Sequence, residues 1–531
     1  MTAHTFFGYF FHMKISNLLS LFGALTLIML STPTRAAIVQ ILHTNDNHSY
    51  LDNSTHSTIR GGAARLKTLI DQYKNMMKDQ GVKTFVVDAG DFLEGNLYFM
   101  AQNGRKSFEV HNEMGYDFGT LGNHDYQMGT DELNKILGEF DLKFSILVAN
   151  LNPALKYGNL KDKISPYKEV DVDGVKIAFL GLTTDELLYK WRLLPGAILD
   201  PIETAQTYDT ILKTRKNDFI IALTHIGVFK DIKLAEKTFN IDLVVGGHSH
   251  TTLFTPVFAE NKAGRKIPIV QAGQHTEFLG RIVLDLQKGK PLKILSYELI
   301  PVVVEAAAST NNIKEIVKSA DAELDAFYGK DWLNQKLGHS DLKPNDESGM
   351  RKWAYYITDS MREKAGADIG IHVPEMNGEN FPIGEITRKD ILNSIPRVFD
   401  LDQKFGWDIY TTKVKGAWLR LTIDALARVG EPLTMSGIKL EYERGPLGFK
   451  IKNITVNGKN VNPFKTYTVA FTEGIVRGAK GIDPRTLAIL QNPYNTGFKI
   501  WATLEDRIVA KPESLARINE ENHTIIWPTK E

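Results

Sequence analysis

Short apolar segments alternate with amphipathic segments along the first 300 residues of the chain. The amphipathic stretches predict helices at 62–78, 130–140 and 201–216, and the apolar or β-branched runs predict strands. This alternation indicates a layered α/β architecture. The last strands follow one another without helices, which predicts added antiparallel strands. The predicted strands are 38–43, 84–88, 145–149, 176–182, 219–224, 243–245, 268–272 and 281–286.

The pattern changes after about residue 300. Residues 305–310 resemble a linker, a charge-mixed amphipathic helix is predicted at 311–328, and another helix at 348–365. Mixed strands and turns follow, with a hairpin predicted around 456–459. We therefore divide the chain into a leader, an α/β domain, a linker with an interdomain helix, and a second, α+β domain. The expected boundaries are 1–36, 37–300, 301–335 and 336–531.

The leader has the pattern of an export signal. Lys14 precedes an apolar run at 18–30, and small residues at 33–37 offer a cleavage site. The run is shorter than the roughly 18 apolar residues that indicate a transmembrane helix. We expect cleavage after Ala36 and a periplasmic or secreted protein; the alternative is an uncleaved anchor.

Composition excludes several classes of protein. The 531 residues are 43% hydrophobic and 24% charged, the ordinary mixture of a globular protein. Lys+Arg and Asp+Glu both number 63, so no overall charge attracts nucleic acid or an anionic membrane. The absence of cysteine excludes disulfides, thiolate metal sites and thiol nucleophiles. Any affinity for anions must therefore come from a local site.

Five polar clusters follow predicted strands. Loops beyond the carboxyl ends of the strands converge on one crevice in an open α/β sheet. Asp, Asn and His without Cys suit borderline divalent ions such as zinc or manganese. One such cluster is more often a turn or a helix cap, but five in succession predict a metal site. The clusters are 43–48, 88–91, 121–125, 223–225 and 246–250.

On these motifs, the chain resembles the calcineurin-like metallophosphoesterases and, within them, the 5′-nucleotidase/UDP-sugar hydrolase family. The resemblance covers nearly the whole chain after the leader, including Arg-Gly-Gly-Ala-Ala-Arg at 60–65. It implies an α/β/β/α layered sandwich followed by an α+β C-terminal 5′-nucleotidase-type domain, which is joined to it by the linker helix. It also implies hydrolysis of phosphate esters with two divalent metal ions (Zn, Mn or similar).

The resemblance implies a role for each clustered residue. His124 would stabilise developing charge or protonate the leaving group. Two divalent ions, two carboxylates and a bridging hydroxide leave a charge of about +1, which attracts a phosphoryl group. The ions would also lower the pKa of the bridging water from about 16 towards 7. The implied ligands are Asp46, His48 and His250 for one metal, Asp91 for both, and Asn123, His225 and His248 for the second.

The first departure from the family lies beside His124. Nucleotidases of this family usually orient this histidine with an aspartate three residues later, where this chain has Gln127. Asp125 is adjacent to His124 and need not contact the imidazole. An amide can fix a tautomer but cannot stabilise an imidazolium as a carboxylate does. What orients His124 is therefore open at the level of sequence.

The second departure lies in the C-terminal domain. Family members clamp the nucleobase between two aromatic rings, whose positions align here with Pro432 and Gly474. A lost ring removes roughly 1–3 kcal/mol of stacking, so we expect modest selectivity for nucleotides and a gain in nucleotide kcat/KM when both rings are restored. The expected substrate contacts are Asn377, Arg397, Phe471 and Lys480. Arg351, Phe399, Phe405 and Trp407 are further candidates; Arg351 also fits a helix surface, and Phe399 and Trp407 also fit a core.

The sequence favours an exported phosphoesterase of small-molecule phosphate esters, such as nucleotides or nucleotide sugars, with a role in nucleotide catabolism. No nucleic acid polymer, stable membrane anchor or obligate protein partner is expected. The alternatives are a cyclic-nucleotide phosphodiesterase, a sulfur-ester hydrolase of the same architecture, and a non-catalytic ligand-binding relative. All seven implied ligand positions carry the residue type of the family, and this favours an enzyme.

Overall fold

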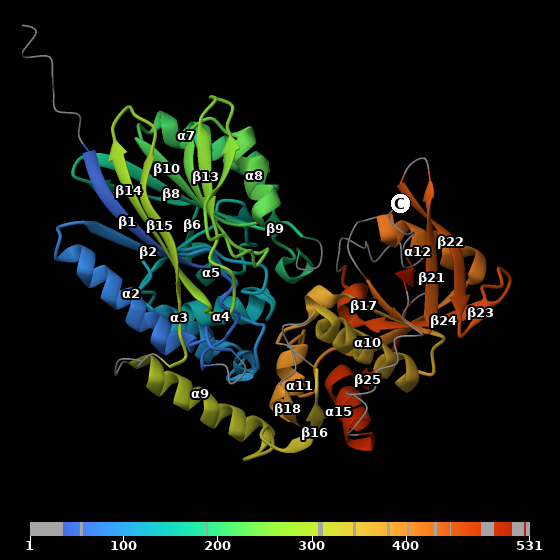
Figure 1. Cartoon of the computed structure of the whole chain (residues 1–531). Helices are drawn as coiled ribbons and strands as arrows, with labels where there is room; N and C mark the ends of the chain where they lie inside the picture. Colours follow the sequence, from blue (N-terminus) through green and yellow to red (C-terminus); the bar gives the residue numbers. More distant parts are fainter. Residues whose placement is uncertain are drawn as a thin grey trace, which may run out of the picture.

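The computed structural model describes most of the chain after the leader. The described residues are 36–53, 57–186, 190–305, 312–342, 347–379, 383–400, 403–428, 433–445, 448–478, 493–511 and 525–526. The predicted leader up to residue 35 lies outside these ranges, as do Pro432 and Lys480. The described residues form two domains, with a long helix along the lower edge of the first domain in Figure 1.

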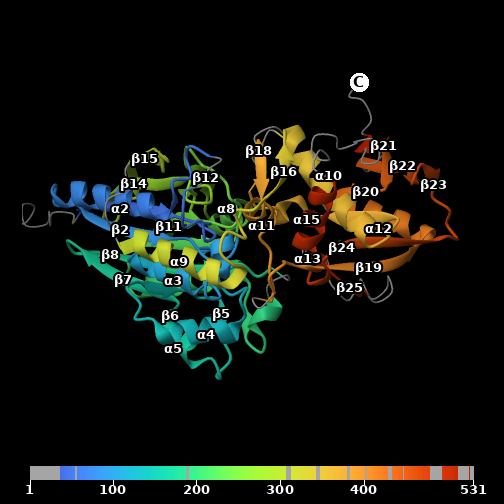
Figure 2. The ribbon, with the colours of Figure 1, turned by 90° about the horizontal axis from the view of Figure 1, so that it is seen from below.

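The first domain contains two packed β-sheets (Figures 1 and 2). Seven strands form one sheet in the order β15-β14-β1-β2-β3-β4-β6, and six form the other in the order β12-β13-β11-β10-β8-β7. Buried side chains such as Ile41, Val87 and Phe179 fill the space between the sheets. The strands are β1 (Ala36–Thr44), β2 (Lys83–Asp88), β3 (Phe118–Gly119), β4 (Ser145–Leu147), β6 (Ile164–Ser165), β7 (Tyr167–Val172), β8 (Val175–Thr183), β10 (Phe219–His225), β11 (Ile241–Gly246), β12 (Val257–Glu260), β13 (Lys266–Val270), β14 (Phe278–Gln287) and β15 (Lys293–Pro301).

Helices cover the outer faces of both sheets. Apolar residues of α2 (Gly62–Lys78), α3 (Arg105–Glu113) and α4 (Thr130–Glu139) join a core on the outer side of the seven-stranded sheet. Those of α7 (Pro201–Thr214) and α8 (Val228–Lys237) pack on the six-stranded sheet. The layers therefore run helix, sheet, sheet, helix, and the predicted α/β/β/α sandwich is confirmed.

The predicted elements recur with small shifts at their ends. The helix expected at 62–78 is α2 with the same bounds. The added antiparallel strands are also present, because β13 pairs with β12 and β14 pairs with β1 and β15 in that sense. The strand β3 was not predicted, since its two residues give no periodicity.

The interdomain helix α9 (Asn312–Tyr328) packs against the first domain and leads to the second. Its Asp321 accepts a hydrogen bond of 2.7 Å from the hydroxyl of Tyr98. Burial of Ile313, Val317 and Leu324 gives it an apolar face against the core. This helix therefore belongs structurally to the first domain while it connects to the second.

Mixed sheets and helices form the second domain. One sheet has the order β20-β17-β24-β19-β25, a second β23-β22-β21-β26, and a third pairs β16 with β18. Asn457 and Gly458 form the left-handed turn of the hairpin predicted there. The elements are β16 (Lys336–Ser340), α10 (Glu347–Lys364), β17 (Ile369–His372), β18 (Gly384–Thr387), α11 (Arg388–Ser394), β19 (Asp408–Lys415), α12 (Gly416–Arg428), β20 (Thr434–Ser436), β21 (Ile438–Gly445), β22 (Gly448–Val456), β23 (Lys459–Asn460), β24 (Thr466–Thr472), α13 (Glu473–Val476), β25 (Tyr494–Lys499), α15 (Ile500–Ala510) and β26 (Ile525–Ile526).

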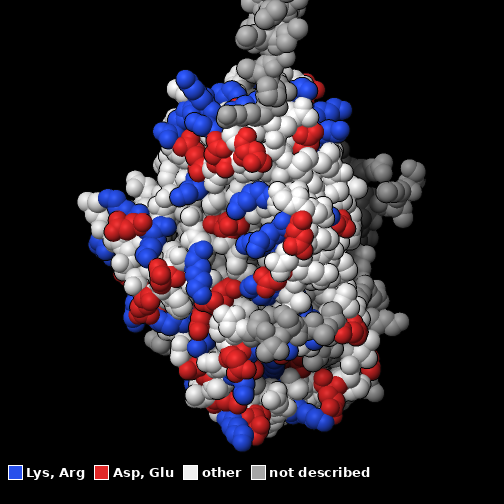
Figure 3. Space-filling view, turned by 90° about the vertical axis from the view of Figure 1, so that its left-hand side faces the viewer, with Lys and Arg blue, Asp and Glu red and all other residues white. Residues whose placement is uncertain are grey.

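The surface shows no single sign of charge on the face drawn in Figure 3. Lysine and arginine side chains are interspersed there with aspartate and glutamate. Among the described residues, no helix has the length and apolar character needed to cross a membrane.

A buried histidine makes the stability of the first domain sensitive to acid. His111 of α3 stacks on Phe92 with ring centroids 3.8 Å apart, and burial lowers its pKa to about 3. The unfolded chain takes up this proton near pH 6.5, whereas the folded chain does not until about pH 3. The contribution of neutral His111 to the free energy of unfolding is therefore fully present above pH 6.5. It is lost as the pH falls below this value, by up to about 1.4 kcal/mol per pH unit.

We expect His111→Phe to reduce this loss of stability, because phenylalanine keeps the stack and cannot be protonated. Urea unfolding at pH 7 and pH 4.5 measures the free energy of unfolding at each pH. Between these two pH values, the variant should lose about 1–3 kcal/mol less than the wild type loses. The exposed His339 provides the control His339→Gln. Equal losses in wild type and His111→Phe would contradict the prediction.

Candidate functional site

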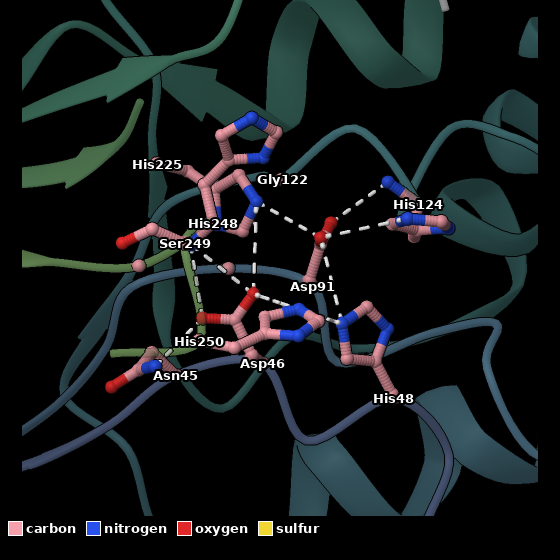
Figure 4. Close-up of polar contacts among 12 residues, drawn as sticks. Asn45, Asp46, His48, Asp91, Gly122, His124, His225, His248, Ser249 and His250 are labelled. Carbon is pink, nitrogen blue, oxygen red and sulfur yellow. Dashed lines mark hydrogen bonds and ion pairs between the residues drawn. The ribbon is translucent and has the colours of Figure 1, made fainter. Parts of the chain in front are cut away.

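The polar clusters meet where strands of both sheets end. The strands β1, β2 and β3 run parallel in one sheet, and β8, β10 and β11 run parallel in the other, so their carboxyl ends face one region. Figure 4 shows side chains from all five predicted clusters pointing toward a common centre. Asp46 and Asp91 lie in the middle and are completely buried or nearly so. The predicted convergence is therefore present in the structure.

Several residues of the site have a left-handed backbone. The φ angles are 52° at Asp46, 50° at His48, 58° at Asp91, 79° at His248 and 54° at His250. Each such residue costs roughly 1–2 kcal/mol relative to ordinary conformations. Hydrogen bonds between loops hold this geometry: the Asp46 amide donates to Gly90 at 2.8 Å, and the His48 amide donates to Asp91 at 2.9 Å. Backbone hydrogen bonds thus fix the loops relative to one another without the help of a ligand.

Close packing of the loops requires glycine at position 122. A side chain there would collide with the carboxylate of Asp91. Asp125 accepts hydrogen bonds from the amides of Asp91, Leu93 and Gly122 at 2.7–2.9 Å. Asp125 therefore holds the loops of the second and third clusters together through their backbone amides.

Three overlapping groups have the spacing of metal ligands. Their ligand atoms lie within 4.8 Å of one another in each group, and Asp91 belongs to two groups. The Nε2 atom of His225 lies 2.9 Å from Asp91, and that of His250 lies 3.3 Å from Asp46. The groups are Asp46, His48 and His250; His48, Asp91 and His124; and Asp91, His225 and His248.

Hydrogen bonds orient the histidines toward the centre. The Nδ1 atoms of His48 and His225 lie 2.7 Å from the carbonyl oxygens of Glu94 and Ala89, which directs each Nε2 inward. His248 is turned the other way, because its Nε2 contacts Glu186 at 2.9 Å. Its Nδ1 and the Oδ1 of Asn123 are buried without a hydrogen-bond partner among the described residues. Buried oxygen and nitrogen atoms of this kind are ligands that divalent cations accept.

The electrostatics of the site point the same way. Burial alone would raise the pKa of Asp91, but the adjacent His225 and His124 hold that pKa well below its usual value. Burial would lower the pKa of His225, but Asp91 and Asp46 raise it to about 10. Without metal, the protonated imidazole therefore takes the place of a cation between the carboxylates. Metal binding at these ligands would displace that proton.

The partner of His124 is Glu94, which the sequence did not indicate. The Glu94 carboxylate contacts the Nδ1 atom of His124 and accepts a 2.7 Å hydrogen bond from Arg397. Gln127 instead donates to Glu94 at 3.4 Å and to the Val398 carbonyl at 3.3 Å. Burial lowers the pKa of His124, and Glu94 and Asp91 oppose this shift while Arg397 adds to it. Glu94 lies three residues after Asp91 in the sequence. This spacing alone does not indicate a contact with His124, because the contact depends on the conformation of the loop.

The predicted substrate contacts lie in different environments. Arg397 reaches the site from the second domain, and its Nη1 lies 3.3 Å from the Nδ1 atom of His124. The Oδ1 atom of Asn377 lies 2.7 Å from the Nε2 atom of His372, within hydrogen-bond distance. Phe471 is a buried residue of β24, which pairs with β17 and β19, and its assignment as a substrate contact stays a prediction. Lys480 lies outside the described residues, as does the side chain of Arg351.

Trp407 occupies the space beside Gly474. A Cβ atom at position 474 would lie 2.5 Å from the Trp407 ring, which itself stacks on Phe399 with centroids 5.0 Å apart. Both rings are buried, so their interpretation as core residues is confirmed. A side chain at position 474 would therefore require Trp407 to move, which argues against the expectation that a ring can be restored there.

Comparisons with known proteins agree with this architecture. Residues 39–252 match the calcineurin-like phosphoesterase family, and residues 339–486 match the 5′-nucleotidase C-terminal domain. The chain is 29% identical to the trifunctional nucleotide phosphoesterase protein YfkN of Bacillus subtilis over 83% of its own length, but spans only 32% of that protein. It is 27% identical to the protein UshA of Yersinia enterocolitica, over 87% of this chain and 88% of that one.

A solved structure shows the same fold. The 5′-nucleotidase precursor of Thermus thermophilus superposes with a TM-score of 0.77 at 24% identity, over 93% of this chain and 100% of that chain. At this identity the likeness concerns the fold alone, and the two family matches carry the assignment. The chain therefore belongs to the family of metal-dependent phosphoesterases that join a calcineurin-like domain to a 5′-nucleotidase C-terminal domain.

Proposed function

We propose that the protein is an exported phosphoesterase that holds two divalent metal ions and hydrolyses small phosphate esters. The observation that supports it best is the set of three overlapping ligand groups, two of which include Asp91, together with buried Asn123 and His248 atoms that have no hydrogen-bond partner among the described residues. In this proposal Asp91 would be shared by both ions. Asp46, His48 and His250 would hold one of them, and Asn123, His225 and His248 would hold the other. Zinc and manganese suit this donor set.

Two bound ions would supply a nucleophilic water at neutral pH and neutralise charge on the phosphoryl group. The residues of the chain have the remaining tasks. Asp46 and Asp91 are fixed from behind: Asp46 accepts from the His248 amide at 2.9 Å, and Asp91 accepts from the His124 amide at 2.8 Å. His124 has its Nδ1 against Glu94, so Nε2, 4.0 Å from Asp91, is the atom that can give a proton to the leaving oxygen.

The second domain supports modest selectivity for nucleotides. Gly474 carries no ring, Trp407 and Phe399 stack on each other instead of leaving a gap, and Phe471 is buried. Only binding energy from remote parts of a substrate separates a nucleotide from a simple ester. We therefore place nucleotides, nucleotide sugars and related esters in one broad substrate class for this protein.

Export rests on the sequence pattern of the leader. Lys14, the apolar run 18–30 and the small residues before Ala37 have the pattern of a cleavable signal. Mass spectrometry of the protein from its source should find a mature chain that starts near Ala37. An intact leader on a membrane-bound protein would contradict export.

We expect 4-nitrophenyl phosphate to be hydrolysed in the presence of manganese or zinc, and a chelator to abolish the activity reversibly. The ratio of kcat/KM for adenosine monophosphate to that for 4-nitrophenyl phosphate should stay within about a hundredfold, roughly 3 kcal/mol. Steady-state kinetics with both esters measure it. No metal-dependent hydrolysis of either ester would refute the proposed function, whereas a nucleotide preference above about a thousandfold, some 4 kcal/mol, would refute only the broad specificity.

A further inference from the structure

Glu94 connects three parts of the site that the proposed function needs. Its carbonyl oxygen lies 2.7 Å from the Nδ1 atom of His48, and its carboxylate contacts His124 and Arg397. The side chain is completely buried. One residue thus touches a proposed metal ligand, the proposed proton donor and the second domain.

The local backbone shows that this placement is tightly determined. Glu94 has a left-handed φ of 42°, which is unfavourable for a residue with a side chain. The next residue, Gly95, packs so closely on His48 that a Cβ there would lie 2.6 Å from the His48 side chain. Backbone strain of this kind persists only where the surrounding structure over-determines it, and it is concentrated at functional sites.

The charge of Glu94 also requires its partner. A carboxylate without exposure to water is costly unless a cation and hydrogen bonds compensate it. Arg397 supplies both, is itself only 6% exposed, and is anchored by a 3.1 Å hydrogen bond from its Nε to the Met376 carbonyl. The pair therefore holds the carboxylate at one position against His124.

Arg397 belongs to a segment of the second domain, residues 393–399, that contacts the first domain along the same loops. Asn393 accepts a 2.9 Å hydrogen bond from the Leu97 amide. The Val398 carbonyl accepts from Gln127, and the Phe399 carbonyl accepts from Arg192. These contacts lie on both sides of Glu94 and of the cluster that contains His124. The positions of both therefore depend on how the second domain packs against the first.

We propose that Glu94 is the positioning residue of His124 in place of the family's aspartate, and that Arg397 of the second domain holds Glu94 in that role. Proton delivery by His124 then depends on the docking of segment 393–399. The inference rests on the proposed phosphoesterase function. It also explains Gln127: the carboxylate comes from the loop after β2, and the amide supports it from the other side at 3.4 Å.

The test compares two esters that differ in their need for a proton. A phenolate leaves poorly without protonation, whereas 4-nitrophenolate leaves readily. We expect Glu94→Gln to lower kcat for phenyl phosphate by about 30-fold and for 4-nitrophenyl phosphate by less than about 5-fold, with little change in KM. Metal content by elemental analysis should remain that of the wild type. The matched control is Glu109→Gln in α3, whose carboxylate pairs with Lys106 at 3.0 Å and should leave both rates unchanged.

Arg397→Met is the second variant, because it leaves the Glu94 backbone and its contact with His48 in place. It should show the same unequal loss on the two esters, and Arg397→Lys should recover part of the phenyl phosphate rate. Equal losses on both esters in Glu94→Gln and Arg397→Met would overturn the proposal, as would wild-type kinetics in either variant. A wild-type protein that hydrolyses neither ester would instead refute the phosphoesterase function.

Discussion

Asp91→Ala is expected to abolish turnover and to remove at least one metal ion per chain. Asp91 is shared by two ligand groups, lies 2.9 Å from His225, and is almost completely buried. Without its carboxylate, the proposed bridge between the ions is lost, and the imidazoles around it lose the anion that balances their charge. We expect kcat/KM for 4-nitrophenyl phosphate to fall by at least about 10⁴-fold, roughly 5 kcal/mol.

Kinetics and elemental analysis on the same preparation test this prediction. Asp79→Ala is the matched control, because Asp79 is an exposed carboxylate at the end of α2 and should leave activity and metal content unchanged. Two metals per chain together with retained activity in Asp91→Ala would show that the site lies elsewhere.

Gly474→Tyr is expected to destabilise the protein and not to create a nucleobase clamp. The new Cβ would lie 2.5 Å from the Trp407 ring, which is 1% exposed and stacked on Phe399. A buried ring cannot yield without moving its neighbours, and overpacking of this kind costs about 1–3 kcal/mol or more. We expect the midpoint of urea unfolding to fall and the ratio of nucleotide to aryl phosphate kcat/KM not to rise.

The double variant Gly474→Tyr/Trp407→Ala distinguishes crowding from other causes. Removing Trp407 alone leaves a cavity and should cost about 3–5 kcal/mol. If crowding is the cause, the tyrosine should be tolerated better in the absence of Trp407, so the two changes should cost less together than the sum of their separate effects. A single Gly474→Tyr variant with wild-type stability and a higher nucleotide preference would show that Trp407 moves aside easily.

Periodicity predicted most of the first domain because its strands and helices bury long, regular apolar patterns. The helix α2 has the predicted bounds, and β1, β8 and β10 extend the predicted strands by one or two residues. Short elements carry no such signal: β3 has two residues, although it orders the cluster that contains Asn123 and His124. Pattern length therefore separates what was predicted from what was missed.

The candidate site divides along a similar line. The residues that converge were predictable, because strand ends and their polar loops can be located along the chain. The contact between Glu94 and Arg397 joins residues 303 positions apart and depends on a left-handed turn at Glu94. Packing at Gly474 likewise depends on Trp407, and nothing in the sequence indicates that these two residues are neighbours. Contacts of this kind follow from tertiary packing and have no local pattern.

The left-handed loops limit how the proposed metal site can change during evolution. Asp, Asn and His are the residues other than glycine that adopt this backbone conformation most readily, and they are also the proposed oxygen and nitrogen ligands of the site. At Asp46, His48, Asp91, His248 and His250, backbone conformation and metal chemistry therefore select the same few residue types. An exchange that chemistry alone would allow, such as aspartate to glutamate, would also have to fit the turn. Descendants of this site should adapt to a new metal through residues behind the ligands sooner than through the ligands themselves.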